Sequence, residues 1–75
     1  MNRTFTALIQ REDDMYVALC TDLDIASQGA SITEARENLK EAIELFFLEA
    51  SDSEVADRLH TEQYISSIEV ALAEA

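Results

Sequence analysis

The side chains that could do chemistry in this chain are one histidine, one cysteine and a large excess of carboxylates. His60 has no obvious serine or cysteine partner for general-base catalysis, and single histidines in polar stretches are mostly surface residues. Cys20 lies inside an expected strand, which favours a small buried residue over a reactive thiol. No motif fixes two metal ions about 4 Å apart. We therefore expect no catalytic residue, no metal and no cofactor, and thus no enzyme.

The charge of the chain is strongly negative. Sixteen acidic residues stand against five basic ones, for a net charge of −11. Such a field repels nucleic-acid phosphates and anionic membranes, so we expect neither to bind directly. The same field attracts a basic protein partner. The alternative interpretation is that the negative charge has no binding role and only keeps the protein soluble.

The length of 75 residues predicts a single domain over residues 1–75. A chain this short buries only about 60% of its unfolded surface, so its stability is marginal. One cysteine cannot form a disulfide within the chain, and no Cys/His cluster is present for a structural metal. We therefore expect a homo-oligomer, a dimer or tetramer, to supply further burial. The single cysteine and the lack of a signal-like or long apolar segment favour a cytoplasmic protein.

The first part of the chain has the pattern of strands. Residues 4–12 and 15–22 are rich in alternating apolar residues, and a short acidic connection between them predicts an antiparallel hairpin. Tyr16, Ala18 and Cys20 should share one face of the second strand. A short third strand is expected over residues 25–28.

A well-marked helix follows the only glycine. Gly29 lacks a Cβ, which permits either a positive φ or a close backbone approach. Ser31 and Glu34 have the spacing of a capping box, which predicts a helix over about residues 32–50. The apolar stripe of this helix widens at its end, so we expect Phe47 and Leu48 to contact a subunit or a partner.

The remaining residues are less clearly patterned. Residues 51–62 are polar, with a helical turn expected at about 54–59. Ile68, Val70 and Leu72 alternate with other residues as in a strand, although the same region also fits one face of a helix. The β-branched residues favour a fourth strand. The expected fold is α+β: a small antiparallel sheet with one helix packed across it, in the order β-β-β-α-β.

An ordered set of short motifs runs from Tyr16 to Leu45. A Tyr–aliphatic–Ala strand start precedes an acidic–Leu turn, a Ser–x–Gly and a helix with two Glu-Ala pairs and an Asn. The residues concerned are Tyr16, Val17, Ala18, Asp22, Leu23, Ser27, Gly29, Ser31, Glu34, Ala35, Asn38, Glu41 and Ala42. This set resembles the HicB-like antitoxin family. The chain departs from that family at Thr21, where a proline is usual, and at Asp24 and Ile25, where Pro-Gly is frequent.

The resemblance implies a partial ribonuclease-H-like fold and the role of antitoxin in a type II toxin–antitoxin pair. The partner it implies is a HicA-like toxin, a small basic RNA-cleaving protein. Many members of the family add a C-terminal DNA-binding domain, for which a chain ending at Ala75 has no room. The expected mechanism is steric masking of the toxin. The alternative is a non-catalytic acidic scaffold or interaction module that forms homo-oligomers and has no toxin partner.

Two groups of residues are candidates for the partner contact. Two connected loops could bring five carboxylates together as one acidic edge, although each residue is also typical of a solvated turn. These carboxylates are Glu12, Asp13, Asp14, Asp22 and Asp24. Binding energy usually comes from apolar and aromatic anchors, for which we select Phe47, Leu48 and Tyr64.

Overall fold

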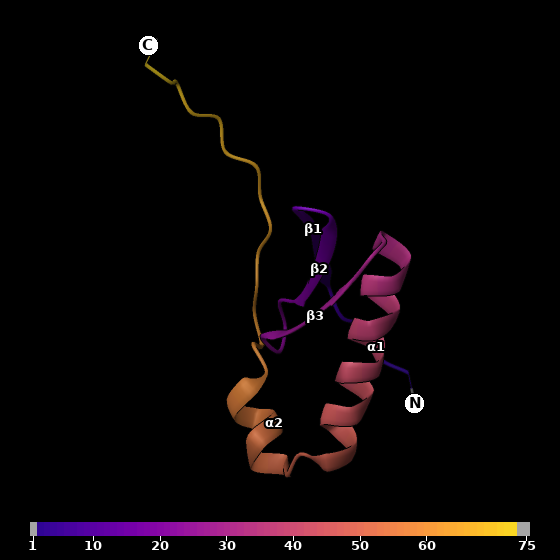
Figure 1. Cartoon of the computed structure of the whole chain (residues 1–75). Coiled ribbons are helices and arrows are strands. Elements are labelled where there is room, and N and C mark those ends of the chain that lie inside the picture. The colour runs from indigo at the N-terminus through magenta and orange to yellow at the C-terminus, as the bar shows by residue number, and fades with distance from the viewer. Residues whose placement is uncertain (1, 74–75) are drawn as a thin grey trace.

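The fold is a three-stranded antiparallel sheet followed by two helices, as seen in a computed structural model that describes residues 2–73 (Figure 1). The strand order in the sheet is β1-β2-β3. The elements are β1 (Ala7–Glu12), β2 (Met15–Cys20), β3 (Ile25–Gly29), α1 (Ile32–Glu49) and α2 (Asp52–Arg58). The α+β class and the order of the first four elements are thus confirmed. None of the described helices is both long and apolar enough to cross a membrane.

The sheet has one face covered by α1 and one face open. Ala18 pairs with Ile9 on one side and with Ser27 on the other, and Cys20 pairs with Ala7 and Ile25. Ala18 and Cys20 are fully buried, as expected for side chains on the covered face. Because side chains alternate along a strand, the neighbouring residues of β2 point to the open face.

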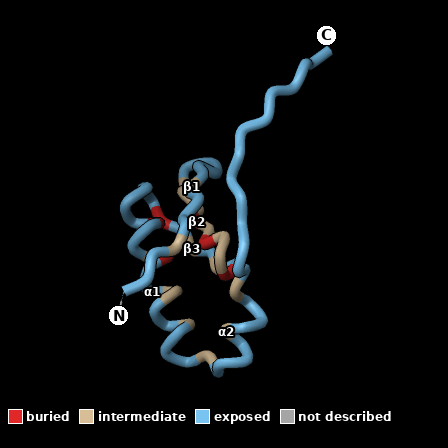
Figure 2. Tube along the Cα trace, turned by 180° about the vertical axis from the view of Figure 1, so that it is seen from behind, coloured by how far each residue is buried: buried red, intermediate tan, exposed pale blue. Residues whose placement is uncertain are grey.

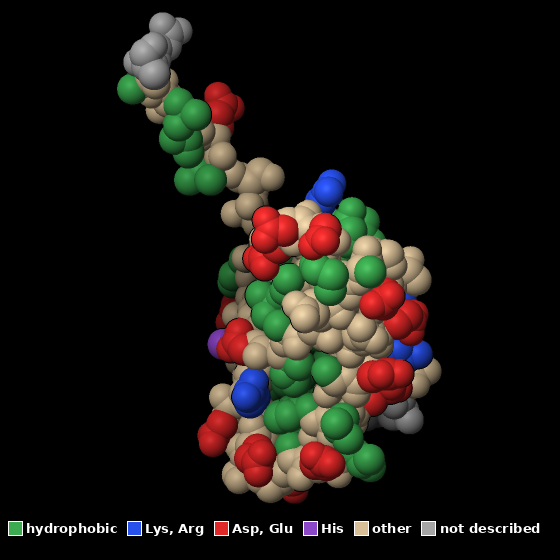
Figure 3. All heavy atoms as spheres, viewed as in Figure 1, with side chains coloured by type: hydrophobic (Ala, Val, Ile, Leu, Met, Phe, Trp, Pro, Cys, Tyr) green, Lys and Arg blue, Asp and Glu red, His purple; other side chains and the backbone are tan. Residues whose placement is uncertain are grey.

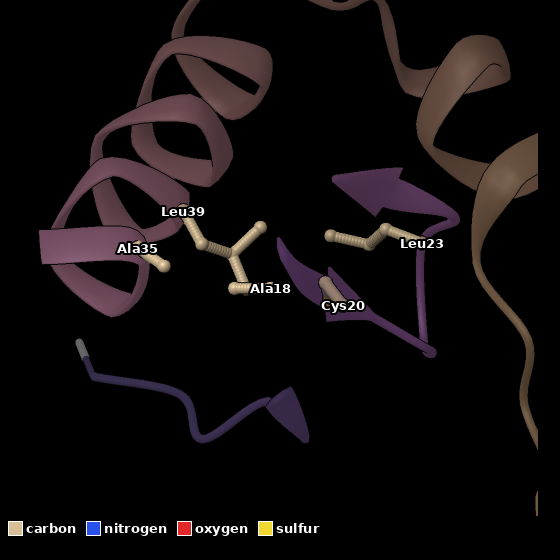
Figure 4. Close-up of a cluster of buried hydrophobic side chains, with 5 residues drawn as sticks. All are labelled: Ala18, Cys20, Leu23, Ala35 and Leu39. Atoms are coloured by element: carbon tan, nitrogen blue, oxygen red, sulfur yellow. The ribbon is translucent and has the colours of Figure 1, made fainter. Parts of the chain in front are cut away.

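The core is small and consists of five side chains from the sheet, one turn and α1 (Figure 4). These are Ala18, Cys20, Leu23, Ala35 and Leu39. Figure 2 shows the few buried positions grouped where α1 meets the sheet, with the rest of the chain half-buried or exposed. So little apolar burial predicts a modest free energy of unfolding.

Gly29 allows α1 to lie directly against the end of β3. Its φ is not positive, so of the two sequence-based explanations the close approach is the correct one. A Cβ at this position would lie 2.5 Å from the backbone nitrogen of Ala35 and 2.8 Å from the carbonyl carbon of Glu34. Both distances are shorter than real Cβ contacts, and backbone atoms cannot move aside cheaply.

The start of α1 is fixed by side-chain hydrogen bonds. The Glu34 N–H donates to Ser31 Oγ at 3.0 Å, as the capping box predicts. The Glu34 carboxylate accepts from the N–H of Ala30 at 3.2 Å. In the usual capping box the donor is instead the N–H of the N-cap residue, here Ser31. One turn further on, Asn38 Nδ2 donates to the carbonyl of Gln28 at 2.8 Å and ties α1 to β3.

The predicted fourth strand is wrong for this chain on its own. Beyond α2, residues 59–73 form neither helix nor strand, and the segment runs away from the body as an extended tail (Figures 1 and 2). Ile68, Val70 and Leu72 do alternate as in a strand, but a strand also needs a neighbouring edge that supplies hydrogen bonds. The strands lie between the tail and α1 in both views, and the tail pairs with no strand among residues 2–73 (Figures 1 and 2).

We predict that Gly29→Ala lowers the free energy of unfolding by about 1–3 kcal/mol, because the added Cβ forces α1 away from β3. Gln28→Ala is the matched control, since Gln28 is an exposed side chain in the same strand. Urea denaturation followed by circular dichroism measures both changes. Equal midpoints for the two variants would contradict the close-approach explanation.

Candidate functional site

The two acidic turns lie at opposite ends of β2. Asp13 and Asp14 form the turn before Met15, and Asp22 and Asp24 follow Cys20. An antiparallel sheet places successive turns at opposite ends, here separated by roughly 20 Å of strand. The structure therefore does not bring these carboxylates together as the one acidic edge that we expected. Whether each turn contacts a partner stays a prediction.

The turn between β1 and β2 is exposed and carries Glu12, Asp13 and Asp14. Asp13 has a φ of 55°, a left-handed conformation that aspartate adopts more readily than most residues. Arg11 Nε donates to the Asp13 carbonyl at 2.9 Å, which braces the backbone of the turn and leaves the carboxylates to solvent. Within residues 2–73, none of these three carboxylates takes part in an ion pair.

The turn between β2 and β3 uses Asp24 to hold the start of the tail. Asp24 Oδ2 lies 2.7 Å from His60 Nε2, and both side chains remain about half exposed. Arg58 Nη1 donates to the Asp24 carbonyl at 3.0 Å and to the Leu23 carbonyl at 3.3 Å. These contacts join residues more than 30 positions apart, and no local sequence pattern marks Arg58 or His60 for this role.

Asp22 is also engaged inside the molecule. Its Oδ1 accepts from the Thr6 N–H and from Thr21 Oγ1, each at 3.3 Å. Its carbonyl accepts the N–H of His60 at 2.8 Å. Asp22 thus connects the start of β1, the end of β2 and the start of the tail. Of the five predicted edge carboxylates, those of Asp22 and Asp24 serve contacts within the chain.

The environment of the single histidine is polar. His60, Asp22 and Arg3 line a polar cleft beside the start of β1, with a volume of about 410 Å³. The bond from His60 to Asp24 resembles a base and its orienting carboxylate, and the hydroxyl side chains of Thr6 and Thr61 line the same cleft. No serine or cysteine is among the described residues that line it. Across residues 2–73, no three His, Cys, Asp or Glu side chains come together as a metal site.

The predicted apolar anchors of α1 lie together at the surface. The Phe47 ring is 5.6 Å from the Phe5 ring and 5.4 Å from the Phe46 ring, and Phe47 remains 38% exposed. Leu48 is 82% exposed. Both line a groove of about 920 Å³ between the N-terminal segment and α1. Such an apolar groove is suited to binding a peptide or protein segment.

Tyr64, the third predicted anchor, lies elsewhere. It belongs to the tail and is 83% exposed. Its hydroxyl donates to the carboxylate of Glu62, which raises the pKa of Tyr64 above its usual value. The tail and α1 lie on opposite sides of the sheet, so Tyr64 does not share a surface with Phe47 and Leu48 (Figure 1).

Cys20 is a buried thiol, as its place in a strand predicted. It is fully buried, and this desolvation raises the pKa of Cys20 despite opposing hydrogen bonds from the backbone N–H groups of Leu23 and Asp22. A raised pKa means that less thiolate is present at neutral pH. The thiolate is the form that attacks electrophiles.

We therefore predict that the Cys20 thiol of the native protein reacts with a disulfide reagent at pH 7.5 at least ~10-fold more slowly than an exposed thiol. Ser53→Cys in a Cys20→Ala chain supplies the exposed reference, because Ser53 is an exposed residue of α2. Absorbance of the released thiolate gives both rates. Unfolding in urea should make Cys20 react as fast as the reference, and an equal rate in the native state would contradict its burial.

Comparison with known proteins places the chain in a family. No family model matches the chain, and no solved structure matches it. It is 37% identical over 68 residues to a UPF0150 protein of Helicobacter pylori (strain J99 / ATCC 700824). That alignment covers 89% of this chain and 94% of the Helicobacter protein. The chain is therefore a member of the UPF0150 family.

Proposed function

We propose that this chain is the antitoxin of a type II toxin–antitoxin pair and that it binds and masks a small basic RNA-cleaving protein of the HicA-like class. The observation that carries the proposal is the excess of unneutralised carboxylates. The net charge is −11, and within residues 2–73 only Glu37 pairs with a lysine or arginine side chain, while Asp24 lies against His60. Figure 3 shows acidic side chains spread over the visible face among few basic ones.

Membership of the UPF0150 family and the motifs from Tyr16 to Leu45 both support this proposal. An enzyme that cleaves RNA must present a basic surface to the phosphate backbone. A folded acidic domain competes with RNA for that surface by charge and by shape. The chain would act in the cytoplasm by steric masking, without chemistry or a cofactor of its own.

The turn between β1 and β2 is the acidic element that we assign to the partner. Its carboxylates, Glu12, Asp13 and Asp14, are exposed and form no ion pair among the described residues. The other acidic turn is already occupied, because Asp24 pairs with His60 and Asp22 accepts two hydrogen bonds. Exposed charges at the rim of an interface mainly change the association rate. Affinity would depend on apolar anchors such as Phe47 and Leu48.

The first experiment is co-purification of the tagged chain with the product of the neighbouring open reading frame. We expect a complex with a small basic protein whose RNA cleavage is suppressed, with a stoichiometry given by light scattering. Recovery of the chain without that neighbour, together with undiminished RNA cleavage when the two are mixed, would refute the antitoxin role.

Neutralising the acidic turn tests the surface. For Glu12→Gln with Asp13→Asn and Asp14→Asn, we predict an association rate with the basic partner about 10-fold lower at low salt, and a smaller difference at 0.5 M salt. Asparagine suits the left-handed φ of residue 13. Stopped-flow or surface-based kinetics measure the rates.

The matched control removes three negative charges elsewhere, through Glu41→Gln, Glu49→Gln and Asp57→Asn. All three side chains are exposed and lie on α1 or α2. The control has the same net charge as the turn variant, so equal rates for the two would show that overall charge, and not the turn, guides the association.

A second candidate function is a homo-oligomeric acidic scaffold without a toxin partner. The observation that favours it is the number of large apolar side chains at the surface, including Leu48, Ile68 and Leu72, each more than 80% exposed. If this function is correct, the chain forms a homo-oligomer and does not bind a basic ribonuclease. The co-purification separates the two functions.

A further inference from the structure

The C-terminal tail is apolar and has no partner within the described chain. Tyr64, Ile65, Ile68, Val70 and Leu72 are between 62% and 85% exposed. Figure 3 shows their green side chains along the tail, away from the body. The Cα radius of gyration is 15.3 Å, whereas a compact domain of this length has roughly 11 Å. Apolar residues gathered in this way mark an interaction segment.

The free edge of β1 offers backbone hydrogen bonds. The Thr21 N–H donates to the Thr6 carbonyl, so the alternation of an antiparallel pair turns the backbone groups of Ala7, Ile9 and Arg11 away from β2. No described strand pairs with that edge. At the other edge, the outward carbonyl of Gln28 already accepts from Asn38. An unpaired edge strand is a template for another strand.

The groove beside β1 is apolar in its floor and basic at its rim. Phe5 and Ala7 line it from the β1 side, and Leu39, Ile43 and Phe47 line it from α1. α1 packs mainly against β3 and β2, which leaves the groove open on the β1 side. Three of the five basic residues of the chain also line this groove, namely Arg3, Arg36 and Lys40. One carboxylate, that of Glu44, lines it as well, and Arg36 pairs with Glu37, so the rim remains basic on balance.

We propose that the tail of a second copy of this chain adds to β1 as a fourth strand, with Ile68, Val70 and Leu72 facing the groove. The chemistry of the two surfaces matches. The tail carries Glu62 and Glu69, and residues 61–75 include no basic residue, whereas the groove is rimmed by basic side chains. Reciprocal exchange of two tails gives a two-fold symmetric dimer.

The occupant is a second copy because a chain's own tail starts near Arg3, which also lines the groove, and then runs away from the body without entering it. The His60 N–H donates to the Asp22 carbonyl and Gln63 Nε2 donates to the Thr21 carbonyl, which hold the start of the tail at the β2–β3 turn. From there the tail lies across the sheet from α1 and continues past the end of the hairpin (Figures 1 and 2). In both views the strands lie between this tail and α1, which lines the groove.

The tail is also long enough for this role. The segment from Tyr64 to Leu72 spans about 30 Å when extended, and the 6 residues of β1 span about 20 Å. Pairing would satisfy the open edge and bury the alternating side chains in one step. This inference does not depend on the proposed toxin, because it concerns only contacts between two copies of the chain.

The test is the mass of the full chain in solution. Light scattering should give twice the chain mass, and Val70→Pro should raise the dimer dissociation constant by about 100-fold, because proline removes a donor from the added strand. Val70 is exposed and lies outside every helix and strand, so the body should still fold. Ala71→Ser is the matched control and should stay dimeric. A monomeric wild type, or a Val70→Pro dimer of unchanged strength, would overturn the proposal.

A cross-link distinguishes exchange between copies from folding within one copy. One chain carries Val70→Cys, and a second, with a larger tag, carries Lys40→Cys; Cys20 stays in place because it is buried. Oxidation of the mixture should join the two differently sized chains. With both substitutions in one chain, a disulfide that leaves the protein monomeric would overturn the proposal, because it would place the tail in the groove of its own molecule.

Discussion

The close approach of Gly29 to the first turns of α1 is the contact on which the rest of the structure depends. Gly29 has no side chain, so the end of β3 can lie so close to the Ala35 nitrogen that a Cβ would not fit between them. The short side chains of Ala18 and Ala35 then let the helix lie low on the sheet, and Asn38 fixes its position along β3. This tight contact explains why so few side chains complete the core.

A close-packed but small core leaves many apolar side chains uncovered. The open face of the sheet, the groove beside β1 and the tail all carry apolar groups at the surface, while the charges are overwhelmingly negative. Any partner that binds only the folded state would stabilise such a chain, since binding shifts the equilibrium away from unfolding.

Local sequence patterns predicted the β-β-β-α order because each element is specified by its own residues. Ser31 with Glu34 marks the helix start, and alternation marks β2. The patterns failed where distant residues decide the outcome. The placement of the two acidic turns depends on strand direction, and the roles of Arg58 and His60 depend on contacts with the β2–β3 turn. The tail has the composition of a strand, but composition does not say which edge will receive it.

The anchoring of the tail at the β2–β3 turn has a consequence for how fast copies would combine. His60 and Gln63 fix the point and the direction in which the segment leaves the body, so its first residues are already placed before it pairs. A preorganised segment loses less conformational entropy on pairing than a coil does. Dissociation requires only that the tail strand lose its hydrogen bonds to the edge of β1, which leaves the Gly29–Ala35 contact intact. Assembly and exchange of subunits can thus proceed without unfolding of either body.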